Sequence, residues 1–180
     1  ERLVLTDGRL RAPATTLVQV ASPSREHVEQ YKALRHEVEV TVGRINGDFS
    51  GLGRPAIHYL HHSYPAEEMA ALYRAADVML VTALRDGMNL VAKEFVAARA
   101  DLDGVLVLSE FAGAADELTQ ALIVNPHDIE GLKRAILTAI EMPHGERRRR
   151  MRALRRKVMD NDVQKGARTF LDALARSGER

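Results

Sequence analysis

The sequence contains no cysteine, which excludes disulfide bonds, thiolate nucleophiles and cysteine-rich zinc sites. It also contains no tryptophan, and aromatic residues make up only 4% of the chain, so few rings are present to stack on nucleic-acid bases. No hydrophobic run approaches the ~18–20 residues that a membrane helix needs. With 26 Lys and Arg against 25 Asp and Glu, no overall field attracts nucleic acid or an anionic membrane. We therefore expect a soluble, cytoplasmic protein that binds neither.

The chain is long enough for one substantial hydrophobic core, at 180 residues of which 46% are hydrophobic. It begins with Glu1, and its first residues have the pattern of a helix end followed by a turn. We expect residues 1–14 to be the end of a preceding helix and a linker, residues 15–160 to form one domain, and residues 161–180 to form a C-terminal helix. The chain is then expected to be a piece of a larger protein.

Strand and helix patterns alternate along the chain at short loop spacing. Strands are predicted at 15–21, 56–60, 77–82, 105–109 and 121–124. Helices are predicted at 25–45, 65–76, 88–99, 114–118, 128–142, 145–159 and 162–175, with residues 46–55 as a loop. This order predicts an α/β fold with a doubly wound, Rossmann-like parallel sheet. Ligands bind such sheets at the carboxyl ends of the strands, which selects the loops 22–25, 61–65 and 83–91.

The most informative of these loops leaves the strand at 77–82 and enters the next helix directly. Gly87 allows a ligand to approach the backbone closely, and the free N–H groups at the helix start favour an anion such as a diphosphate. Asp86 precedes this turn and can accept hydrogen bonds from sugar hydroxyls. Glu94 lies four residues after Leu90 and therefore on the same helix face. The alternative is a capped helix start with Glu94 on a solvated face, and the spacing alone leaves both interpretations open.

Arg25 begins a helix after the first strand, where it can either bind a phosphate or form a surface ion pair.

Four other patterns favour structural interpretations. Residues 51–56 match a relaxed dinucleotide fingerprint but precede a strand instead of following one. Residues 101–103 (DLD) read as a plain turn. Three histidines, His58, His61 and His62, lack a convergent carboxylate, so no metal is expected. The arginine-rich stretch at 147–157 has no aromatic residue, which favours a solvated helix face over a nucleic-acid surface.

The stretch 84–94 (LRDGMNLVAKE) resembles the signature of the trehalose-6-phosphate synthases, which are retaining glycosyltransferases with the two-domain GT-B fold. Residues 24–25, 43–47, 107–115 and 123–126 resemble the same family in order and spacing, so the resemblance runs from about 15 to 161. It implies that the chain is the C-terminal, nucleotide-sugar-binding half of such an enzyme, without its N-terminal domain. The family also uses an Arg and a Lys from a segment just upstream, so we expect weakened donor affinity here.

The resemblance implies a role for each motif position. Asp86 and Arg25 would be the catalytic side chains, with Asp86 on the donor glucose and Arg25 on the phosphate of glucose 6-phosphate. Glu94 would bind the ribose hydroxyls of the donor. The turn at Gly87 and the backbone N–H groups that follow it would hold the sugar hydroxyls and the diphosphate; these belong to Met88, Asn89, Leu90 and Val91. Val20 and Tyr64 would flank the base.

The reaction that the resemblance implies transfers glucose from UDP-glucose, or another nucleoside diphosphate glucose, to glucose 6-phosphate. The product is α,α-trehalose 6-phosphate, formed with retention, without a metal and without a protein nucleophile. We expect the chain to be inactive alone and the full-length enzyme to be a possible homo-oligomer. The alternatives are a related glycosyltransferase with another phosphorylated acceptor and a noncatalytic nucleotide-sugar-binding or regulatory module. The choice between UDP, ADP and GDP stays open.

Overall fold

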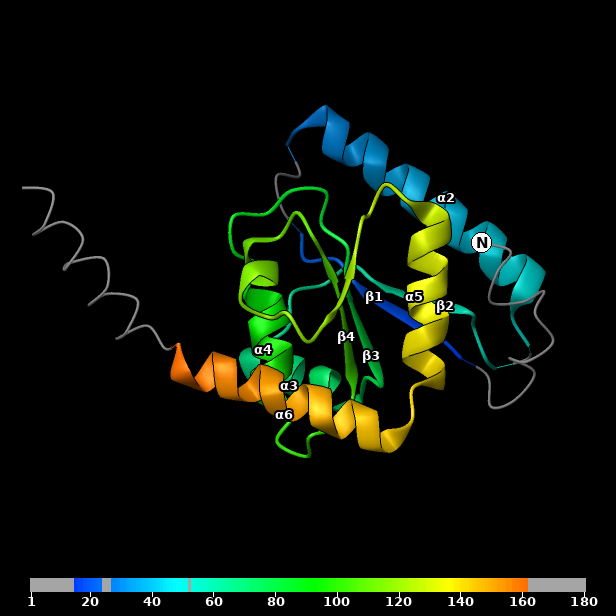
Figure 1. Cartoon of the computed structure of the whole chain (residues 1–180). Coiled ribbons are helices and arrows are strands. Elements are labelled where there is room, and N and C mark those ends of the chain that lie inside the picture. Colours follow the sequence, from blue (N-terminus) through cyan, green and yellow to red (C-terminus); the bar gives the residue numbers. More distant parts are fainter. Residues whose placement is uncertain (1–14, 24–26, 52, 162–180) are drawn as a thin grey trace, which may run out of the picture. The chain divides into compact units, whose positions relative to one another are not determined.

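The computed structural model of the chain describes residues 15–23, 27–51 and 53–161 (Figure 1). The strands are β1 (Leu17–Val20), β2 (Ile57–Leu60), β3 (Val78–Val81), β4 (Val105–Ser109) and β5 (Leu122–Val124). The helices are α2 (Glu29–Phe49), α3 (Ala66–Ala75), α4 (Leu90–Ala98), α5 (Ile129–Glu141) and α6 (His144–Asp160), with a 3-10 helix η2 (Gly113–Asp116). All five predicted strands are confirmed. The predicted segments 1–14 and 162–175 lie outside the described residues.

The prediction that residues 46–55 form a loop is wrong for its first four residues, because α2 continues to Phe49. Asn46, in the last turns of this helix, pairs with the backbone of β2: its Nδ2 donates to the carbonyl of Ile57 at 2.9 Å, and its Oδ1 accepts from the Ile57 N–H at 2.8 Å. Gly47 costs about 1 kcal/mol relative to alanine in a helix. The two hydrogen bonds that Asn46 makes from within the helix offset that cost.

The chain divides into two compact units, residues 1–66 and 67–180, which are described separately. In the first unit, β1 and β2 pair in parallel, with Leu17 opposite Ile57 and Val20 opposite Leu60. In the second unit, β3, β4 and β5 form a parallel sheet with β4 in the centre. Parallel pairing brings the carboxyl ends of neighbouring strands to one edge of each sheet, which is where the candidate loops begin.

The core of the second unit lies on both faces of β4, whose five residues are all buried. Successive side chains of a strand point to opposite faces. Leu106 and Leu108 accordingly pack with residues of α4 and α6, while Val105 and Val107 pack with residues of α5. Figure 1 shows α5 on one side of this sheet and α4 on the other. Helices on both faces explain why β4 reads as a continuous hydrophobic run.

Arg99, at the end of α4, is a buried structural residue that the sequence analysis did not identify; its side chain is only 5% exposed. Its guanidinium donates to the backbone carbonyls of Tyr73, Arg74, Ala76 and Asp103, and it pairs with Asp101 at 3.1 Å. The carboxylate of Asp103 pairs with Arg147 at 3.3 Å. Both aspartates of the DLD pattern therefore bind arginines in a turn.

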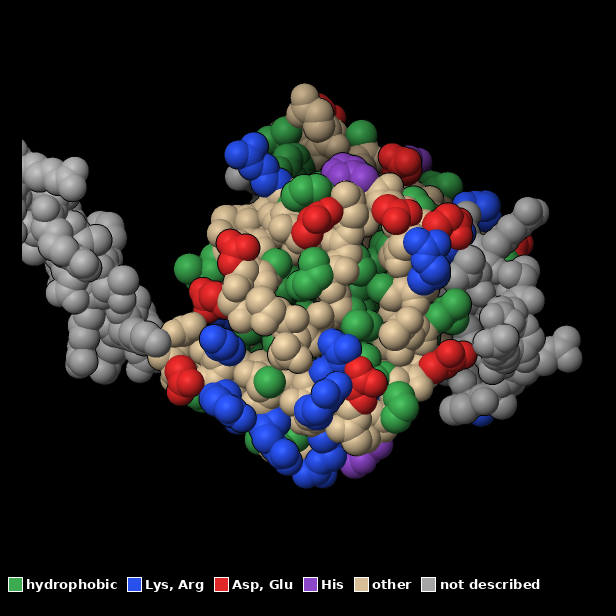
Figure 2. Space-filling view, in the orientation of Figure 1, with side chains coloured by type: hydrophobic (Ala, Val, Ile, Leu, Met, Phe, Trp, Pro, Cys, Tyr) green, Lys and Arg blue, Asp and Glu red, His purple; other side chains and the backbone are tan. Residues whose placement is uncertain are grey.

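The arginine-rich helix α6 is only partly a solvated face. Figure 2 shows Lys and Arg side chains gathered over this helix. The prediction is wrong for Arg147, Arg150 and Arg155, which are half-buried and bonded to the protein. Arg150 pairs with Glu146 at 2.8 Å and donates to the carbonyl of Gln120, while Arg155 donates to the carbonyls that end α4. The other basic side chains of this stretch are exposed: Arg148, Arg149, Arg152, Arg156 and Lys157.

Among the described residues, no helix is both long enough and apolar enough to cross a membrane.

Candidate functional site

Asp86 organises the loop between β3 and α4. Its Oδ1 accepts hydrogen bonds from the N–H groups of Met88 and Asn89, at 3.1 and 3.0 Å, and its Oδ2 accepts one from Nδ2 of Asn89 at 3.1 Å. A carboxylate has about four acceptor positions, so Oδ2 retains capacity for a further donor. Asp86 is half-buried and can both fix its own loop and bind a hydroxyl. However, the N–H groups of Met88 and Asn89, which the resemblance assigns to a ligand, are bonded to Asp86 in this structure.

Asn89 sets the direction in which the chain enters α4. Its backbone is left-handed (φ 69°, ψ 84°), a conformation that asparagine adopts more readily than most residues. Its Oδ1 accepts from the N–H of Ala92 at 2.9 Å and so caps the helix. The N–H groups of Leu90 and Val91 have no acceptor among the described residues. These two groups, at the positive end of the helix dipole, are suited to an anion.

The segment 111–114 is hydrogen-bonded to the backbone of this loop. The N–H of Asp86 donates to the carbonyl of Phe111 at 3.1 Å, and the N–H of Gly113 donates to the carbonyl of Asp86 at 3.2 Å. A third bond, of 2.8 Å, runs from the N–H of Ala114 to the carbonyl of Met88. A Cβ at Gly113 would overlap the carbonyl of Gly87, so only glycine permits this approach. The sequence analysis placed 107–115 in the resemblance but assigned it no role.

Glu94 lies on the exposed face of α4, one turn after Leu90. Its Oε2 accepts a hydrogen bond of 3.0 Å from the hydroxyl of Tyr73, a buried residue of α3. Burial raises the pKa of Tyr73 to about 12, with further contributions from its hydrogen bond to Glu94 and from the negative charge of that carboxylate. The Glu94 side chain is thus exposed but held on one side by Tyr73, and its contact with a ligand stays a prediction.

Lys93, the cation next to Glu94 in the sequence, forms an ion pair with Glu117. Its Nζ lies 3.0 Å from both carboxylate oxygens of Glu117, and its side chain is 16% exposed. Lys93 therefore has its charge paired within the protein, on the side of Glu117.

Val20 and Tyr64 belong to the first unit. Val20 ends β1, and Tyr64 follows the end of the neighbouring strand β2 by four residues. Both are half-buried, and the ring of Tyr64 packs edge-on against His62 with centroids 5.0 Å apart. Val20 is thus at the carboxyl end of β1 and Tyr64 beyond that of β2, and their contact with a base stays a prediction. Arg25 lies outside the described residues, so its role stays a prediction.

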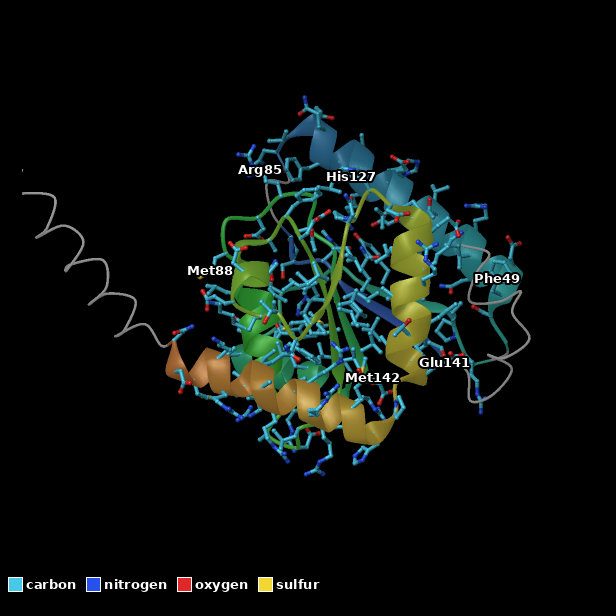
Figure 3. All side chains as sticks on the ribbon, viewed as in Figure 1. Phe49, Arg85, Met88, His127, Glu141 and Met142 are labelled. Carbon is cyan, nitrogen blue, oxygen red and sulfur yellow. The ribbon has the colours of Figure 1, made fainter. Side chains whose placement is uncertain are left out.

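In the second unit, two aromatic residues that the sequence analysis did not single out follow β4 and β5. Phe111 follows β4 and is 41% exposed, and its ring lies 5.9 Å from that of His127, which follows β5. Figure 3 shows Arg85 and His127 at one end of the second unit and Met142 at the other. The only feature of the sequence that could have identified Phe111 and His127 was their position after a predicted strand.

No group of three His, Asp or Glu side chains within the described ranges is arranged to hold a metal ion. His58 is exposed in β2, His61 stacks on Tyr59, and His62 contacts Tyr64. Metal independence stays a prediction, because it concerns the reaction of the whole enzyme.

Comparison with known proteins covers nearly the whole chain. Residues 3–176 match the model of glycosyltransferase family 20. The trehalose-6-phosphate synthase of Mycobacterium avium (strain 104) is 57% identical over 177 residues, and that of Mycobacterium leprae (strain TN) is 58% identical over 177 residues. In both cases the match covers 98% of this chain and 36% of the relative. The chain thus spans little more than a third of these proteins.

Two solved structures show the same fold. The Escherichia coli structure bound with UDP-2-fluoro glucose is 40% identical, with a TM-score of 0.90 over 96% of this chain and 38% of that one. The α,α-trehalose-phosphate synthase (UDP-forming) of Burkholderia xenovorans, in complex with glucose-6-phosphate, is 46% identical, with a TM-score of 0.84 over 87% of this chain and 35% of that one. The predicted fold class, an α/β half of a GT-B glycosyltransferase, is confirmed. The chain belongs to glycosyltransferase family 20.

Proposed function

We propose that this chain is the donor-binding part of a trehalose-6-phosphate synthase. The full enzyme would transfer glucose from a nucleoside diphosphate glucose to glucose 6-phosphate, with retention at the donor carbon. The observation that carries the proposal is the loop 86–91. There, one aspartate and one asparagine bind the N–H groups of Met88, Asn89 and Ala92, and those of Leu90 and Val91 are left without an acceptor among the described residues. Such a helix start stabilises the negative charge of a diphosphate.

In the proposed reaction, the acceptor's anomeric oxygen forms a bond to C1 of the donor glucose, and the bond from C1 to the diphosphate oxygen breaks. The acceptor hydroxyl proton passes to the leaving diphosphate on the same face. No carboxylate pair is required, so catalysis depends on positioning and on stabilising the developing diphosphate charge. The N–H groups of Leu90 and Val91 would supply that stabilisation. The remaining acceptor position on Asp86 Oδ2 would orient a hydroxyl of the donor glucose.

The remaining contacts follow the family resemblance. Glu94 would bind the ribose hydroxyls, Val20 and Tyr64 would flank the base, and Arg25 would bind the acceptor phosphate. The ligands in the E. coli and Burkholderia xenovorans structures support UDP-glucose as donor and glucose 6-phosphate as acceptor. We expect the full-length enzyme to need no metal, to act in the cytoplasm and to pair this half with an N-terminal GT-B domain.

Titration calorimetry tests the donor assignment. The 180-residue chain is titrated with UDP-glucose, ADP-glucose and GDP-glucose, and the titrations are repeated on Glu94→Gln. Glu68→Gln is the matched control, since Glu68 is an exposed glutamate on α3. We expect weak binding, strongest for UDP-glucose, that Glu94→Gln reduces and Glu68→Gln leaves unchanged. A folded chain that binds none of the three contradicts a donor site in this half. Binding that both variants retain equally contradicts the role of Glu94.

A further inference from the structure

Tyr73 is a buried polar residue directly beside the candidate site. It is 6% exposed, and its ring packs edge-on against Phe95 with centroids 6.4 Å apart and an interplanar angle of 84°. Its hydroxyl donates a hydrogen bond of 3.0 Å to Oε2 of Glu94 on α4. A phenol with two side-chain torsions, locked by a neighbouring ring, is a rigid donor.

Glu94 without this contact would be a mobile surface side chain. Fixing a glutamate side chain costs rotamer entropy, and a ligand would otherwise have to offset that cost on binding. The Tyr73 hydroxyl fixes one oxygen in advance and leaves Oε1 without a partner among the described residues. Since the pKa of Tyr73 is about 12, its hydroxyl remains a donor throughout the neutral range.

We propose that Tyr73 is a positioning residue that orients the Glu94 carboxylate for the vicinal hydroxyls of the donor ribose, without itself touching the ligand. This inference rests on the proposed function, which assigns the ribose to Glu94. It adds a specificity: the fixed carboxylate favours a ribonucleotide over a nucleotide that lacks those hydroxyls. Glu94 Oε1 can accept a hydrogen bond from a ribose hydroxyl, and a sugar without the 2′ and 3′ hydroxyls has no donor to offer it.

The test compares Tyr73→Phe with the unchanged chain, because this variant removes the hydroxyl and keeps the ring against Phe95. Affinities are measured for UDP and for 2′,3′-dideoxyuridine diphosphate. We expect Tyr73→Phe to weaken UDP binding about three- to ten-fold, because the ligand must then order the Glu94 side chain itself, and to change binding of the dideoxy analogue less than about two-fold. Tyr31→Phe, the same chemical change on an exposed part of α2, serves as control.

Glu94→Gln and the double variant separate positioning from a general structural effect. If Tyr73 acts through Glu94, Tyr73→Phe has little further effect on UDP affinity in the Glu94→Gln background. If Tyr73→Phe weakens binding of UDP and of the dideoxy analogue by the same factor, the inference is overturned. It is also overturned if Glu94→Gln lowers the affinity for UDP but Tyr73→Phe leaves that affinity unchanged. A parent chain that binds no UDP overturns the proposed function and this inference together. The two failures are therefore distinguishable.

Discussion

Asp86 makes three hydrogen bonds to its own loop, so removing it would change more than one ligand contact. Asp86→Ala is expected to destabilise the fold by about 1–3 kcal/mol and to weaken binding of free UDP as well as UDP-glucose. Chemical denaturation and calorimetry measure these effects. The matched control is Asp116→Ala, at an exposed position of η2. A variant that loses UDP-glucose affinity but keeps full stability and UDP affinity would show that Asp86 contacts only the sugar.

Tyr73 also predicts a pH dependence. Its pKa in the folded chain is about 12, against the ordinary tyrosine value of 10.0, so the folded state favours the protonated phenol. Its contribution to stability is therefore complete below the unfolded pKa and is lost as the pH rises from about 10 to about 12. Denaturation midpoints measured across this range should fall more steeply for the unchanged chain than for Tyr73→Phe. Parallel curves for the two proteins would refute the shift.

At the scale of elements, the loop before α4 depends on the segment that leads into η2. Gly113→Ala places a methyl group against the carbonyl of Gly87, so either the loop moves or η2 moves. We expect a destabilisation of about 1–3 kcal/mol, as in other overpacked sites, and weaker UDP binding. Gly145→Ala is the control: a Cβ there meets nothing within 4 Å, and the change raises helix propensity in α6. Equal UDP affinities in the two variants would exclude 111–114 as a support of the site.

At the scale of the whole molecule, the chain spans 36% of the relatives it matches. The resemblance places an Arg and a Lys for the diphosphate in an upstream segment, and acceptor contacts in the N-terminal domain. We expect the 180-residue chain to release no UDP from UDP-glucose and glucose 6-phosphate, while a chain extended through the upstream segment binds UDP-glucose more tightly. A coupled assay for UDP and calorimetry measure the two quantities. Turnover by the 180-residue chain alone would show that the acceptor site is complete within it.

The sequence by itself determined the five strands, the order of the helices around them and the loop that carries the candidate site, because periodicity and glycine or asparagine at turns are local properties. It did not determine the end of α2, which continues to Phe49. The site roles of Val20, Arg25 and Tyr64, and the extent of the domain, stay predictions. Three contacts were decided only by the tertiary structure: Tyr73 bonds to Glu94, Gly113 packs against the carbonyl of Gly87, and buried Arg99 donates to backbone carbonyls. In the sequence, Tyr73 lies 21 residues from Glu94 and 26 residues from Arg99, and a local pattern carries no record of which distant atoms will meet.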